Sequence, residues 1–123
     1  MEIFFKDSNY SPTIVILKIL LYAFEEFGNT EVRINSIEEI GDEFIERNNG
    51  EVYMKTGMTL KLLDFLSFII RRNNINNLFV DIHTNDKEII NIFLEDSEIL
   101  NIDGVEEKKI QDFIEKYLSG YLY

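Results

Sequence analysis

Residues 78–102 read LFVDIHTNDKEIINIFLEDSEILNI, and this stretch decides the fold. It contains two turn signals, Asn85-Asp86 and Asp96-Ser97, because Asn, Asp and Ser favour turn conformations. The turns separate three apolar runs that are rich in Ile, Leu, Val and Phe and short enough for strands. These runs are residues 78–83, 89–94 and 99–102. Strands joined by such short turns pair with their neighbours, so we predict a three-stranded antiparallel meander.

Helical patterns lie on both sides of the predicted meander. Gly104 interrupts the chain, and residues from Val105 to Leu118 then repeat apolar side chains at the spacing of a helix. Before the meander, Thr59 has a side chain that can cap a helix running to about Arg72. The face of this helix that we expect to be buried is apolar and consists of Leu62, Leu63, Phe65, Leu66, Ile69 and Ile70.

Another helix is predicted near the start of the chain, after a short strand at Glu2–Lys6. Ser11 can cap this helix, and Pro12 suits its first position. The pair Gly28-Asn29 ends it after Phe27. Between these ends the helix has almost no polar face, and a helix that is apolar all round is expected to be surrounded by protein. We therefore predict a central core helix.

Residues 31–56 fit two different structures. In the first, Ser36-Ile37-Glu38-Glu39 is a capping box that opens a helix over residues 37–48. In the second, Val32 and Ile34 lie on a strand, and the chain turns at Gly41-Asp42. The second structure continues as a hairpin, whose strands and turn are Phe44–Arg47, Asn48-Asn49-Gly50 and Val52–Lys55.

A shift of the sequence by 48 residues favours the strands. It places Val32 on Val80 and Leu62 on Ile110, and other apolar positions coincide in the same way. The match is one of hydrophobic pattern, and it suggests a duplicated helix-plus-three-strand unit. We therefore predict a single globular α+β domain over residues 1–123, in which antiparallel sheet packs against three helices. The predicted order is β-α-βββ-α-βββ-α, with a helix over residues 37–48 as the main alternative.

The composition excludes several classes of protein. The 123 residues include no cysteine, which excludes disulfides, thiol nucleophiles and cysteine zinc sites. The longest apolar run, Thr13–Phe24, is interrupted only by Lys18 and has 12 residues, whereas a membrane-spanning helix needs about 20. The acidic residues before this run, Glu2 and Asp7, are unlike those of a signal peptide. We expect a cytoplasmic protein that does not enter a membrane.

Motifs for catalysis and for cofactors are missing from the sequence. It has no G-x-S-x-G nucleophile elbow, no P-loop and no G-x-G-x-x-G. The single histidine, His83, follows Asp81 at a spacing that puts both side chains on one strand face, where they could supply two metal ligands. A metal site would need a third ligand, and a strand-end histidine beside a carboxylate is the more common arrangement. We therefore expect no enzyme activity, no cofactor and no metal.

Acidic residues are concentrated in two blocks of the chain. The formal net charge is −11, which argues against direct contact with nucleic acid, because phosphates are bound by Lys and Arg. Residues 25–51 hold nine acids against Arg33 and Arg47, and residues 81–107 hold nine against Lys87. Surfaces of this kind steer the approach of basic partners. The residues that we expect to contact a basic protein partner are Glu38, Glu39, Asp42, Glu43, Glu46, Glu88, Glu95, Asp96 and Glu98.

These features together resemble the small acidic immunity proteins with which bacteria block their own secreted nuclease toxins, of the contact-dependent inhibition and colicin types. The resemblance rests on size, acidity, the absence of cysteine and the lack of catalytic motifs. It implies that carboxylates of this chain pair with the Lys and Arg side chains that a nuclease uses to hold phosphates. Two other functions fit the same sequence. One is an acidic nucleic-acid mimic that inhibits a DNA-binding enzyme, and the other is a structural or adaptor subunit whose acidity serves solubility.

Overall fold

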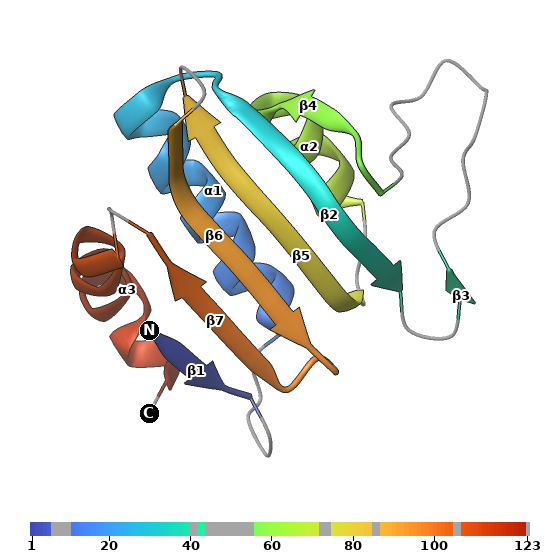
Figure 1. Cartoon of the computed structure of the whole chain (residues 1–123). Coiled ribbons are helices and arrows are strands. Elements are labelled where there is room, and N and C mark those ends of the chain that lie inside the picture. The colour runs from blue at the N-terminus through green and yellow to red at the C-terminus, as the bar shows by residue number, and fades with distance from the viewer. Residues whose placement is uncertain are drawn as a thin grey trace.

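One antiparallel sheet organises the protein, and helices pack against it (Figure 1). The structure is a computed structural model that describes residues 1–5, 11–39, 42–43, 56–71, 75–84, 87–104 and 107–122. In these residues the elements follow the order β-α-βββ-α-βββ-α, so the predicted α+β class and element order are confirmed. None of the helices in this part of the chain is long and apolar enough to cross a membrane.

The sheet has seven strands in the order β1-β7-β6-β5-β2-β3, and the short strand β4 also pairs with β2. The strands are β1 (Glu2–Phe4), β2 (Glu31–Glu39), β3 (Asp42–Glu43), β4 (Thr59–Lys61), β5 (Ile75–Thr84), β6 (Lys87–Glu95) and β7 (Ile99–Asp103). The helices are α1 (Pro12–Phe27), α2 (Leu62–Ile70) and α3 (Glu107–Leu122). In Figure 1, α1 and α2 lie behind the sheet, and α3 lies beside α1 near β7.

The predicted meander is confirmed. Strand β5 pairs with β6 and β6 pairs with β7, both antiparallel. The turn between β6 and β7 is centred on Asp96 and Ser97, whose φ angles are 51° and 59°. Positive φ at two consecutive residues is the φ pattern of type I′ turns, which match the twist of the strands that they join. Alternate residues of these strands, such as Val80, Ile92 and Ile102, are fully buried under the helices.

Residues 31–39 and 42–43 form strands, so the helix alternative over residues 37–48 is wrong for the part that the structure describes. The register pairs Ile37 with Leu78 and Glu38 with Asn77 of β5. Ile37 is buried in this arrangement, because the ladder places it on the helix-covered face. The long-range backbone hydrogen bonds of the strand therefore outweigh the local tendency of the capping box to start a helix. The other predicted strands and their hairpin, over residues 44–55, lie outside the described residues.

The start of α2 corrects the sequence-based prediction. Thr59 does not cap the helix, because it lies in β4 and pairs with Arg33 of β2. The helix begins at Leu62, and its first free N–H groups find partners from a distant part of the chain. The Leu62 N–H donates to Thr30 O (2.7 Å), and the Leu63 N–H donates to Asn29 Oδ1 (2.9 Å). The cap therefore belongs to the loop between α1 and β2.

Helix α1 packs against the sheet by one face only, which corrects the prediction of a helix surrounded by protein. Its residues Ile16, Ile19, Leu20 and Ala23 are fully buried. Its far side faces solvent, because α1, α2 and α3 form a single layer and nothing in the described residues covers that layer from outside (Figure 1). The exposed side of α1 is nevertheless apolar.

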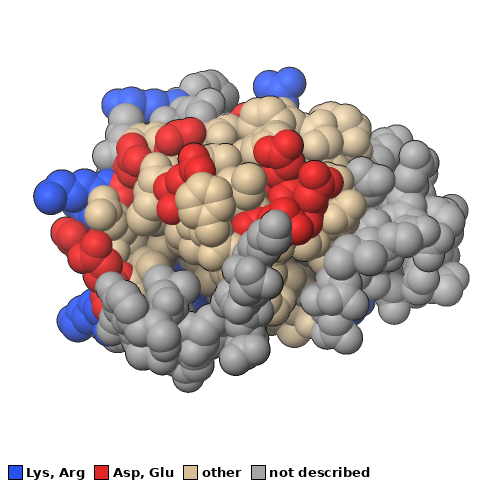
Figure 2. Space-filling model, turned by 90° about the horizontal axis from the view of Figure 1, so that it is seen from below, with Lys and Arg blue, Asp and Glu red and all other residues tan. Residues whose placement is uncertain are grey.

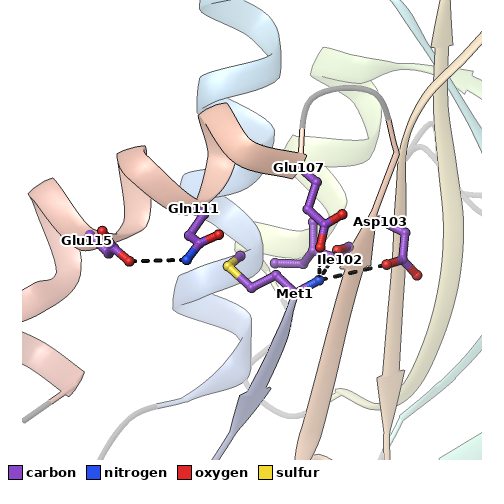
Figure 3. A network of polar contacts seen from close by, with 6 residues as sticks. All are labelled: Met1, Ile102, Asp103, Glu107, Gln111 and Glu115. Atoms are coloured by element: carbon purple, nitrogen blue, oxygen red, sulfur yellow. Dashed lines mark hydrogen bonds and ion pairs between the residues drawn. The ribbon is translucent and has the colours of Figure 1, made fainter.

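The N-terminal residue is tied to both β7 and α3 (Figure 3). The amine of Met1 donates to Ile102 O (2.8 Å) and to the carboxylate of Glu107, and it lies 3.8 Å from Asp103 Oδ1. Strand β1 pairs with β7 next to these contacts, so the beginning of the chain forms one edge of the sheet. The same contacts anchor the first turn of α3.

Candidate functional site

Antiparallel pairing brings the two acidic blocks to the same end of the sheet. Glu38 of β2 pairs with Asn77 of β5, and the Asp96 N–H donates to Asn77 Oδ1 (3.0 Å) from the β6–β7 turn. The end of β2 and this turn therefore lie on either side of β5, about 10 Å apart at a strand spacing of about 4.8 Å. We call this region the acidic end, and it comprises Glu38, Glu39, Asp42, Glu43, Glu95, Asp96 and Glu98.

Figure 2 looks at the molecule from this end and shows acidic side chains in groups over the described surface, with basic side chains mainly towards the margins. Glu95, Asp96 and Glu98 are all exposed. Arg71, the residue that ends α2, precedes β5 and so lies towards the same end. The structure places Glu38, Glu39, Asp42 and Glu43 by their backbone positions in β2 and β3.

Two of the nine predicted contact residues are not part of the acidic end. Glu88 pairs with His83 at the beginning of β6, which is the opposite end of the sheet. Glu46 lies outside the described residues. The sequence predicts contact residues in two separate segments, 38–46 and 88–98. The fold brings most of the predicted residues of both segments together in the acidic end.

The β6–β7 turn is held firmly against the start of β5. The Ser97 hydroxyl donates to Ile75 O (2.9 Å), and the Ser97 N–H donates to Asn76 O (2.8 Å). Within the turn, the Glu98 N–H donates to Glu95 O (3.0 Å). These bonds hold the backbone that carries the three acidic residues in place, which lowers the entropy lost when a partner binds.

The open face of the sheet carries an aromatic strip that the sequence analysis missed. Phe79 and Phe93 make an edge-to-face contact, with ring centroids 5.3 Å apart and planes at 80°. Phe4 is 63 % exposed, and it pairs with Ile99, which in turn pairs with Glu95. The strip of Phe4, Phe79, Phe93 and Ile99 therefore adjoins the acidic end. The sequence signal for this strip is the alternation in β5, because Phe79 lies between buried Leu78 and Val80 and so points to the other face.

Beside the aromatic strip, the carboxylate of Asp81 is occupied by two amides. Asn35 Nδ2 donates to Asp81 Oδ2 (2.9 Å), and Asn91 Nδ2 donates to Oδ1. These bonds link β2, β5 and β6 across the open face, so Asp81 has a structural role. The metal-ligand interpretation of Asp81 and His83 finds no third ligand, because the described residues contain no group of three His, Asp or Glu able to hold a metal.

His83 lies at the opposite end of the sheet, in a cleft of about 330 Å³. The carboxylate of Glu31 lies between its Nδ1 (3.9 Å) and Lys61 Nζ (3.8 Å). The Thr30 hydroxyl donates to His83 O, and Asn29 caps α2 as described above. The polar groups of this cleft thus connect β2, β4, β5 and the start of α2 to one another.

No protein-family model, curated protein or solved structure matches this chain. Its surface chemistry is therefore the ground on which a function can be argued. That chemistry consists of a rigid acidic turn, a second acidic strand end close to it, and an aromatic strip adjoining the turn.

Proposed function

We propose that this protein is a non-catalytic binding protein that neutralises a basic partner, most specifically an immunity protein that blocks a secreted bacterial nuclease toxin. The observation that carries the proposal is the convergence of Glu38 and Glu39 with Glu95, Asp96 and Glu98 at one end of the sheet. This function requires the protein to act in the cytoplasm, where the nucleic acids that such a toxin attacks are found.

The acidic end suits the surface that a nuclease presents to phosphates. Such a surface is rich in Lys and Arg, so complementary potentials accelerate the encounter and disfavour other partners. The fixed β6–β7 turn adds preorganisation. The aromatic strip supplies the apolar centre that tight protein interfaces usually place beside a charged rim.

The aromatic strip also separates this proposal from nucleic-acid mimicry. A mimic needs carboxylates in rows that reproduce the spacing of phosphates, and it has no need for exposed apolar groups among them. Phe4, at 63 % exposure beside Ile99 and Glu95, instead fits the mixed surface of a protein partner. Binding to a protein is therefore the better supported of the two functions.

The test is a charge change at the acidic end. A triple variant, Glu95→Lys, Asp96→Asn and Glu98→Lys, removes three exposed carboxylates, and Asn keeps the left-handed conformation of residue 96 accessible. Losing one partner of a buried charge pair costs about 2–5 kcal/mol. We expect the affinity for the toxin domain to fall by a factor of about 30 or more.

The partner used in the test is the protein encoded by the adjacent reading frame. Neutralisation is measured as growth rescue of cells that express this partner, and binding is measured by titration calorimetry. The matched control is Glu26→Lys, Asp112→Asn and Glu115→Lys, which changes the net charge equally at exposed positions outside the acidic end. Circular dichroism checks that both variants are folded. The proposal is wrong if the wild-type protein neither binds nor neutralises that product, or if the acidic-end variant protects as well as the control.

A further inference from the structure

A large apolar surface lies on the outer side of the helices, opposite the open face of the sheet. Ile70 of α2 is 61 % exposed, and Ile14, Leu21, Phe24 and Leu63 are between 36 and 47 % exposed. Among the described residues these are five of the six large hydrophobic side chains with such exposure, the sixth being Phe4. With the partly buried Leu17 and Leu66, they form what we call the helix patch. Clustering of this kind marks an interaction site.

The helix patch is continuous across α1 and α2. Tyr22 of α1 contacts Phe113 of α3, with ring centroids 5.5 Å apart, so this flank of α1 faces α3. At 100° per residue, Leu17 and Phe24 lie on the other flank, which faces α2. On α2, Leu63, Leu66 and Ile70 repeat at helical spacing along one stripe. The direct packing of α1 against α2 brings the two stripes together.

The helix patch is also the part of the surface where charge is balanced. The charged residues of α1 and α2, together with the residues that directly precede and follow α2, are three bases and three acids: Lys18, Lys61, Arg71, Glu25, Glu26 and Asp64. The protein as a whole has a net charge of −11. Two copies can therefore approach each other through the helix patch without the like-charge repulsion that the acidic end would cause.

We propose that the helix patch is the interface between two copies of this chain. A two-fold axis requires a self-complementary surface. Lys18 and Glu25 are seven residues apart on one flank of α1, so antiparallel packing of the two α1 helices places each Lys18 opposite Glu25 of the other copy. The same arrangement puts Leu21 near the axis, against its counterpart.

The size of the helix patch predicts how tight the dimer is. Helix α1 has 16 residues and is about 24 Å long. Helix α2 has 9 residues and is about 14 Å long. With the helices packed 8–10 Å apart, each presents a strip about 9 Å wide, which gives about 340 Å² per copy. A standard stable interface buries about 800 Å² per partner. We therefore expect a reversible dimer that forms as the protein concentration rises.

The test is sedimentation equilibrium over a wide range of protein concentration. The weight-average mass should rise from 14.5 kDa towards twice that value. Leu21→Glu should abolish this rise, whereas Phe4→Glu, at the more exposed position on the open face, should not. Circular dichroism and thermal unfolding establish that each variant is folded.

A charge exchange provides a second test that does not depend on the folding of Leu21→Glu. Lys18→Glu alone and Glu25→Lys alone should each weaken dimerisation, and the double variant should restore it, because the opposite charges face each other again. A mass of 14.5 kDa at every concentration would overturn the proposal and leave the helix patch to a different protein. Dissociation by Phe4→Glu but not by Leu21→Glu would place the interface on the open face. The acidic-end variant should dimerise normally, so this proposal and the proposed function can fail separately.

Discussion

Ile92 and Phe93 are neighbours in β6, yet they face different surroundings. Ile92 is fully buried beneath the helices, between Val80 and Ile102 on the adjacent strands. Phe93 is half-buried on the open face, where it contacts Phe79 and shares the face with Asn91 and Asp81. The covered face is uniformly apolar and supplies stability. The open face combines an amide network with aromatic side chains, so it can contact a partner without loss of the core.

The largest effect should come from the covered face. Ile92→Ala removes three methyl or methylene groups from a site with no exposed surface and leaves a cavity. We expect a loss of about 2–5 kcal/mol in the free energy of unfolding. Urea denaturation followed by circular dichroism measures this loss as a lower midpoint with an unchanged slope. A cost below about 1 kcal/mol would mean that the helices do not pack against this part of the sheet as described.

An intermediate effect is expected for the amide network on the open face. Asp81→Leu leaves the side-chain amides of Asn35 and Asn91 without their acceptor. Unpaired polar groups that are partly buried cost about 1–3 kcal/mol. The same denaturation experiment applies, with Glu95→Leu as the control, because Glu95 is exposed on the same face. Equal stability of the two variants would show that solvent replaces the network without cost.

The smallest effect should come from the aromatic strip. Phe93→Leu removes the edge-to-face contact with Phe79 but keeps an apolar side chain on a half-buried surface. We expect a loss of about 0.5–1.5 kcal/mol, together with weaker binding of the basic partner in calorimetry. If Phe93→Leu destabilised the protein more than Ile92→Ala, the division of roles between the two faces would be wrong.

The two sets of strands show where sequence-based prediction succeeds. In β5, β6 and β7 each strand pairs with the next, and the alternation of apolar residues together with Asp96-Ser97 is sufficient to predict them. In the first set, β4 pairs with β2 although β3 lies between them in the sequence. The two sets thus differ in pairing despite their similar hydrophobic pattern. The local pattern predicts a helix cap at Thr59, because the pairing of Thr59 with Arg33 is a long-range contact that no local pattern encodes.

The candidate site shows the same limit. The acidity of residues 38–46 and 88–98 can be read directly from the sequence, but their meeting depends on β5 lying between β2 and β6. Glu88, predicted beside Glu95, is separated from the acidic end by the length of β6. The two ends of an extended strand lie far apart, so residues that are close in sequence can be distant in space.

By itself the sequence determined which side chains had to leave water, where the chain turned, and the element order that followed, because these properties depend on neighbouring residues. Tertiary structure alone decided strand order, the capping of α2 by Asn29, and the joining of two acidic blocks at one end of the sheet. It also decided that no other described part of the chain covers the apolar far side of α1. The physical reason is that hydrophobic burial is non-directional. It fixes how much surface must be covered, while long-range backbone pairing selects what covers it.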